Sequence, residues 1–181
     1  MEPSRPKEFI KYLVGLTGAS GGRGGDRAAL ADLRHGIATA AAERAWPHIA
    51  PFCDLRDQSA LDAFAVVGAG FALHGTTDPQ AGNMGASLRR LAVEGKNSPT
   101  DALNSFGARF RRLLTCNSTD EVCALLPGIL RATARKGIPV NYELLLHDLR
   151  TWDKDVKVRW AQSYWGAASG SQPSAQEGAE E

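Results

Sequence analysis

Residues 66–73 carry the glycine spacing that would suit chemistry on a nucleotide. Gly68 and Gly70 follow an apolar run, as in the fingerprint in which a glycine-rich turn lets the backbone approach a pyrophosphate. Two features argue against this interpretation. Leu73 occupies the position of the third small residue, and no alternation of strands and helices surrounds the segment. We therefore predict that the glycines allow close contact between helices and that no dinucleotide is bound.

Residues for hydrolytic or metal chemistry are also poorly arranged. No histidines have the spacing of metal ligands. The nearest thiol and imidazole, Cys53 and His48, are more typical of incidental packing than of a nucleophile with its base. The sequence predicts no enzymatic activity, no cofactor and no metal site.

Cysteine usage and hydropathy indicate the compartment. The three cysteines, Cys53, Cys116 and Cys123, are odd in number and lack paired short spacings, so they are predicted to be free thiols in a reducing cytosol. No run of 18 apolar residues and no signal-peptide core occurs, so neither a membrane span nor export is predicted. We expect a cytoplasmic protein.

The distribution of charge carries the functional signal. The 181-residue chain has 21 Lys and Arg against 20 Asp and Glu, a net charge of +1. Residues 1–82 hold 8 basic and 9 acidic side chains, whereas residues 83–166 hold 13 and 8. The second half is therefore locally basic, which is typical of a face that binds a polyanion.

Composition predicts the elements that would position such a face. The chain has 28 Ala and 19 Leu against 8 Val and 5 Ile, so good helix formers greatly outnumber β-branched residues. We predict an all-α fold of two small helical bundles with about eight or nine helices.

In the first half, apolar residues at helical spacing predict helices beginning near Lys7 and Arg27, with Asp26 as the N-cap of the second. A helical piece around Trp46 is broken by prolines, and a longer helix covers residues 59–74 until Gly75 ends it. Residues 18–25, with five glycines, are predicted to form a flexible loop.

The second half has clearer start and stop signals. A short helix covers residues 84–92, Ser98 caps a helix that runs to about Thr115, and Asn141 caps another. Between these, Ser118 and Glu121 form a predicted capping box for a helix that ends at Gly137, and the last helix covers residues 156–164. We predict an N-terminal bundle (1–80), a C-terminal bundle with a basic surface (83–165) and a disordered acidic tail (166–181).

The arginines of the second half point away from the predicted core. At 100° per residue, Arg131 and Arg135 lie opposite Val122, and Arg112 lies opposite the apolar stripe of its own helix. Arg109 and Arg111 flank Arg112 on either side. Clustered like charges repel one another, and the planar guanidinium suits phosphate, so we interpret the set as a surface for a polyanion.

Several segments, taken in order, resemble the CasB family, the small subunit of the type I-E CRISPR surveillance complex Cascade. They are RAALADLR (27–34), FALH (71–74), GASLRRL (85–91), FRRLL (110–114), KGIPVNY (136–142), LRTWD (149–153) and VRWA (158–161). The likeness covers residues 27–164 and rests on the ordered combination.

The resemblance implies a non-catalytic, all-helical subunit that is present as two copies beside the crRNA-bound backbone and large subunits. Such subunits help to hold target DNA and the displaced strand of the R-loop. From this role and the surface geometry, nucleic-acid contact is predicted for the following residues: Arg27, Arg34, Arg89, Arg90, Arg109, Arg111, Arg112, Arg131, Arg135, Lys136, Arg150, Lys154, Lys157 and Arg159. Asp153 and Asp155 make the stretch around Lys154 and Lys157 mixed in sign.

A second interpretation remains open at this point. The same arginines could contact acidic patches on neighbouring subunits, because arginine serves interfaces with proteins as well as with nucleic acids. The chain would then be an interaction scaffold. The two hypotheses differ in whether the isolated protein binds nucleic acid in a salt-dependent manner.

Overall fold

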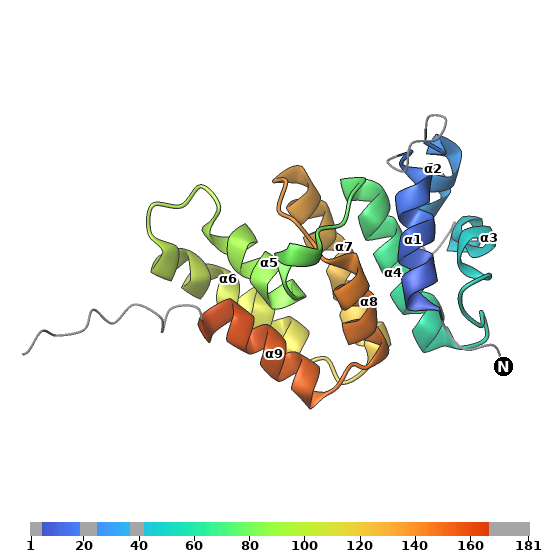
Figure 1. Ribbon diagram of the computed structural model, residues 1–181. Helices are drawn as coiled ribbons and strands as arrows, with labels where there is room; N and C mark the ends of the chain where they lie inside the picture. The colour runs from blue at the N-terminus through green and yellow to red at the C-terminus, as the bar shows by residue number, and fades with distance from the viewer. Residues whose placement is uncertain (1–4, 19–24, 37–41, 167–181) are drawn as a thin grey trace, which may run out of the picture.

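The computed structural model describes residues 5–18, 25–36 and 42–166, and this part of the chain is helical without any strand (Figure 1). The all-α prediction is confirmed. The predicted loop at 18–25 falls almost wholly outside the described residues, as does the tail beyond Gly166. No helix in the described ranges is long and apolar enough to cross a membrane.

The first half contains four α-helices and one 3-10 turn in its described residues. They are α1 (Pro6–Leu16), α2 (Arg27–His35), the 3-10 turn η1 (Ala42–Ala45), α3 (Trp46–Ile49) and α4 (Gln58–His74). Asp26 caps α2 as predicted, its side chain accepting a hydrogen bond from the N–H of Ala29 at 2.9 Å. Gly75 ends α4 with φ +73°, a conformation that glycine adopts without strain.

Helix α4 is the central helix of the molecule. The spacing of apolar residues in 59–74 predicts one buried stripe, but every residue from Ala63 to Ala72 is buried, because α2 and two helices of the second half pack around this apolar segment. α4 packs against α2 towards one end of the molecule and against α7 and α8 towards the other (Figure 1). The buried side chains of both halves therefore form one continuous cluster.

The second half contains five α-helices and one 3-10 turn in its described residues. Its elements are the 3-10 turn η2 (Pro79–Ala81), α5 (Met84–Val93), α6 (Pro99–Leu114), α7 (Thr119–Arg135), α8 (Tyr142–Arg150) and α9 (Lys154–Trp165). Ser98 and Asn141 cap α6 and α8 as predicted. The predicted capping box at Ser118 is wrong, because the Ser118 side chain makes no capping hydrogen bond. Glu121 accepts a hydrogen bond from the N–H of Asn117 instead. The Ser118 hydroxyl bonds the carboxyl of Asp120 and lowers its pKa.

The glycines in the apolar run of α4 serve close packing, as predicted. A Cβ added at Gly70 would lie 2.7 Å from Cδ1 of Leu130 and 2.9 Å from the ring of Tyr142, and one at Gly68 would lie 3.0 Å from Leu33. A similar approach occurs between α5 and α9, where Gly85 lies against the backbone of Trp160. The helices pass close together at these glycines, and at Gly85 the nearest atoms are backbone, which leaves no room for a larger residue.

Candidate nucleic-acid interface

An open groove separates α6 from α7. One hollow of about 730 Å³ is lined by Lys96, Arg109 and Lys136 over a floor that includes Leu91, Phe106 and Ala132. A second hollow of about 300 Å³ shares Arg109 and adds Arg112, above Leu113, Leu125 and Ile129. We call these residues together the α6–α7 groove. Cationic side chains line an apolar floor along its length.

The groove is basic because few carboxylates offset its cations. Asp101, at one end, is the sole acidic residue among the described residues that line it. The guanidinium of Arg109 lies 5.5 Å from the ring centroid of Phe106, and Nζ of Lys136 donates to the carbonyl of Glu94 at 3.5 Å. Neither contact neutralises the charge, so both cations remain available to an anion.

Arg112, Arg131 and Arg135 also remain unpaired within the described part of the chain. All three are exposed, and no ion pair or hydrogen bond joins their guanidinium groups to another described residue. Helix rotation places Arg135 about 20° from Gly128, a residue that lines the groove. The structure therefore brings Arg109, Arg112 and Lys136 together and places Arg131 and Arg135 on the adjoining outer face of α7.

Arg111 lies on the opposite side of α6. Its guanidinium folds back over Gly107 towards α9. Burial raises the pKa of the Tyr164 phenol on α9, and the charges of Arg89 and Arg111 oppose this rise. Arg89 joins Arg111 there and donates to the Tyr164 carbonyl at 2.8 Å. The adjacent residues Arg111 and Arg112 thus lie on two separate surfaces of α6.

Several predicted contact residues are engaged within the fold. Arg34 donates to the carbonyl of Ala72 and Arg90 to that of Ala81. Arg150 pairs with Asp57 at 3.3 Å, and Lys157 lies 5.7 Å from the ring centroid of Trp152. Arg27 and Lys154 are exposed at helix starts, away from the α6–α7 groove linings.

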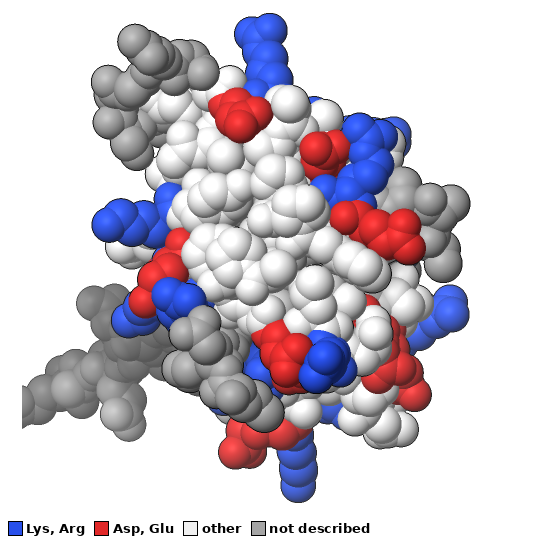
Figure 2. Space-filling view, turned by 90° about the vertical axis from the view of Figure 1, so that its right-hand side faces the viewer, with Lys and Arg blue, Asp and Glu red and all other residues white. Residues whose placement is uncertain are grey.

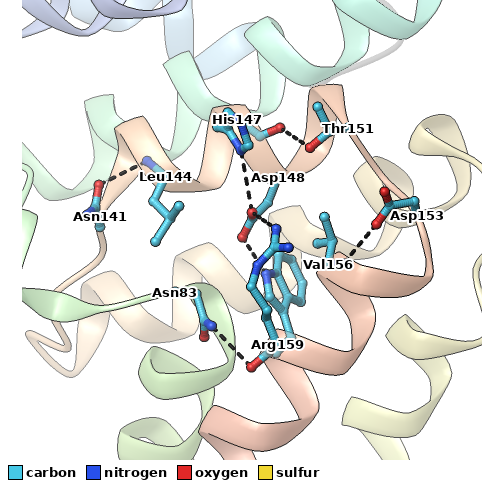
Figure 3. A network of polar contacts seen from close by, with 10 residues as sticks. Asn83, Asn141, Leu144, His147, Asp148, Thr151, Asp153, Val156 and Arg159 are labelled. Atoms are coloured by element: carbon cyan, nitrogen blue, oxygen red, sulfur yellow. Dashed lines mark hydrogen bonds and ion pairs between the residues drawn. The ribbon is translucent and has the colours of Figure 1, made fainter.

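Arg159 belongs to a polar network around a buried carboxylate, which the sequence did not predict (Figure 3). Asp148 on α8 is fully buried and accepts from Nε1 of Trp160 at 2.6 Å and from the Arg159 guanidinium at 3.1 Å. A buried carboxylate is stable only when charged or donating partners satisfy it. Asp148 therefore links α8 to α9, and the guanidinium of Arg159 donates one of the linking hydrogen bonds.

The far end of the molecule has no comparable basic surface. Figure 2 views the end that carries α1, α2 and α3, and there Lys and Arg are scattered among Asp and Glu around a central area that has neither. Near this end, Arg44 pairs with Asp32 at 2.8 Å. The distribution agrees with the balanced charge of the first half of the sequence.

The cysteines and His48 in the described residues are buried or hydrogen-bonded within the fold. All three cysteines are free and buried, and burial raises the pKa of the Cys53 thiol to about 11. His48 bonds the Tyr12 hydroxyl through Nδ1 at 2.7 Å. Among the described residues, no three His, Cys, Asp or Glu side chains are grouped as metal ligands would be.

Replacing Arg150 with Gln tests whether that residue acts in the fold. We expect the free energy of unfolding to fall by at most about 1 kcal/mol, because the pair with Asp57 is partly exposed and screened by water. Affinity for DNA should not change, since Arg150 lies outside the α6–α7 groove. Urea denaturation and DNA titration of the same preparation check both expectations. A loss of DNA affinity would show that Arg150 takes part in the nucleic-acid interface.

Fold and surface together define an all-helical protein whose second half presents an open, basic-rimmed groove. The model of the CRISPR-associated protein Cse2 family matches residues 29–165, so the chain belongs to this family. It is accordingly a subunit of a CRISPR-associated complex.

Solved structures agree with this assignment. CasB from Thermus thermophilus has 27% sequence identity and a TM-score of 0.67, covering 91% of this chain and 99% of the other. A second structure from the same organism, a CRISPR-associated protein of the Cse2 family, has 26% identity with the same TM-score and coverage. A comparison with curated proteins finds no match.

Proposed function

We propose that this chain is the non-catalytic small subunit of a type I-E Cascade complex and holds nucleic-acid strands by their phosphates in the α6–α7 groove. The observation that carries the proposal is the grouping of Arg109, Arg112 and Lys136 along one open groove with little acidic compensation. Lys96, which sequence reasoning missed, adds a fourth cation because the loop before α6 brings it to the same wall.

The chemistry of these residues suits backbone contact. Arginine binds phosphate through two parallel N–H groups, and contacts to phosphate fix the position of a strand without reading its bases. Exchange of a DNA duplex for an RNA–DNA heteroduplex is nearly balanced in energy, so a few phosphate contacts can favour the open R-loop. The subunit would stabilise target DNA and the displaced strand without reading sequence.

The proposal includes the setting of the complex. Neighbouring subunits would be the crRNA-bound backbone, the large subunit and a second copy of this chain, in the cytoplasm. The isolated subunit is then expected to bind DNA weakly, because each copy presents one groove, whereas the assembled complex offers several binding surfaces to the same strand.

A salt titration of the intact protein tests the proposal. We expect fluorescence anisotropy to report binding to labelled DNA of unrelated sequences with similar affinities, and the logarithm of the affinity to fall linearly with the logarithm of salt, by about 0.7 per phosphate contact on a single strand. Sequence-selective binding would contradict the proposal. Absence of binding at the lowest salt would favour the scaffold hypothesis, in which these arginines contact acidic subunits.

A further inference from the structure

Trp165 is an aromatic side chain left partly in water at the end of α9. Its exposed fraction is 37%, whereas Trp160 and Tyr164 on the same helix are fully buried. It lies on the side of α6 that faces away from the α6–α7 groove, because its ring contacts Phe110 and its neighbour Tyr164 donates to the carbonyl of Leu103. The indole therefore belongs to none of the groove contacts described above.

A cluster of aromatic rings, in tilted and edge-to-face contacts, supports this indole. The ring centroids of Phe110 and Trp165 are 5.0 Å apart, and those of Tyr164 and Trp165 are also 5.0 Å apart. Phe110 and Tyr164 are stacked in turn, with centroids 4.3 Å apart and an interplanar angle of 28°. An indole held in this way loses little side-chain entropy when a planar ligand stacks on its open part.

Two cations lie beside these rings. Arg111 is exposed, has no ion-pair partner among the described residues, and extends over Gly107 on the side of α6 that carries Phe110. Arg89 is held in place by its bond to the Tyr164 carbonyl. An aromatic face beside a free guanidinium matches a nucleotide, whose base stacks and whose phosphate pairs with the cation.

We propose that Trp165 and Arg111 form a second contact site for nucleic acid, in which one unpaired base stacks on the indole and the adjoining phosphate binds Arg111. The inference rests on the proposed function for the nature of the partner, but it adds a contact to the base itself. α6 would then contact nucleic acid on both of its sides, through Arg112 in the groove and Arg111 at the α9 edge.

The test compares two labelled probes of equal length, oligothymidine and a chain of abasic nucleotides with the same phosphates. For the full-length protein, Trp165→Ala should weaken oligothymidine binding about tenfold and leave the abasic probe unaffected, because only the former has bases to stack. The slope with salt should not change. Trp46→Ala is the matched control, since Trp46 has a similar exposed fraction of 38% in the first half of the chain.

Tryptophan fluorescence provides an independent signal. Oligothymidine should quench the emission of the wild type and of the Trp46 variant, and the quenching should be lost in Trp165→Ala. Trp165→Tyr, which keeps an aromatic ring, should recover part of the affinity and controls for a folding defect.

Other outcomes would overturn the inference. Equal affinity of the wild type for both probes would exclude stacking, and so would equal weakening of both probes by Trp165→Ala. If groove variants lose binding while Trp165→Ala does not, the second site is wrong and the proposed function stands. If the wild type binds neither probe at low salt, both are wrong.

Discussion

Replacing Arg109, Arg112 and Lys136 together with glutamate is expected to weaken DNA binding by about 100-fold or more at low salt. These side chains line one groove, so reversing their charge turns an attractive surface into a repulsive one. The salt slope on single-stranded DNA should also fall by about 2, since three counterion-releasing contacts are lost. Anisotropy titrations at several salt concentrations measure both quantities.

A control of equal charge change separates position from net charge. Lys7, Lys11 and Arg56 are exposed residues of the first half, and their replacement by glutamate changes the charge of the protein by the same amount. This control should lower affinity only slightly, through the long-range field. If both triple variants lose the same affinity, the α6–α7 groove is not the binding surface.

The largest effect on stability is expected at Gly85, where Gly85→Ala should lower the free energy of unfolding by about 3 kcal/mol. The added Cβ would lie 2.7 Å from the carbonyl carbon and 2.8 Å from Cα of Trp160. Both atoms are backbone, so no rotamer change can relieve the overlap, and α5 must move away from α9. Urea denaturation followed by circular dichroism measures the loss.

Gly15→Ala in α1 is the matched control for this substitution. No atom lies within 4 Å of the position that a Cβ would occupy there, and Gly15 is exposed inside a helix. The same change should raise stability by about 0.5–1 kcal/mol, because alanine loses less backbone entropy on folding. A Gly85 variant as stable as the wild type would show that the contact with Trp160 is not tight.

The helices could be predicted from the sequence because their signals are local. Asp26, Ser98 and Asn141 each cap a helix through a side chain that bonds an N–H three residues further on. The prediction of a capping box at Ser118 was wrong, although the residue types fit, because the Ser118 hydroxyl bonds Asp120 instead. The burial of α4 on all sides was missed because it depends on α2, α7 and α8 packing around it.

The candidate site was predictable only in part. Helical spacing correctly places Arg112 on an exposed face and Arg109 and Arg111 on either side of it. It gives no information on partners that are distant in the sequence. Arg150 meets Asp57 across 93 positions, and Lys96 reaches the groove through a loop whose path no periodicity describes.

The packing brings together some of the segments that resemble the family. Gly85 touches the backbone of Trp160, and the hydroxyl of Ser87 donates to the carbonyl of Pro139 at 2.8 Å. Residues from three of those separate segments therefore meet around α5. These contacts hold α5, α9 and the turn after α7 together.

The burial of α4 on every side determines how the protein can come apart. Ten consecutive residues of α4 face other parts of the protein, and none of them is exposed. Loss of either α2 or α7 would expose a helix with no polar side chain in its central turns, which water solvates poorly. Partial opening is therefore costly, and we expect the described helices that contact α4 to unfold in one cooperative transition rather than in stages.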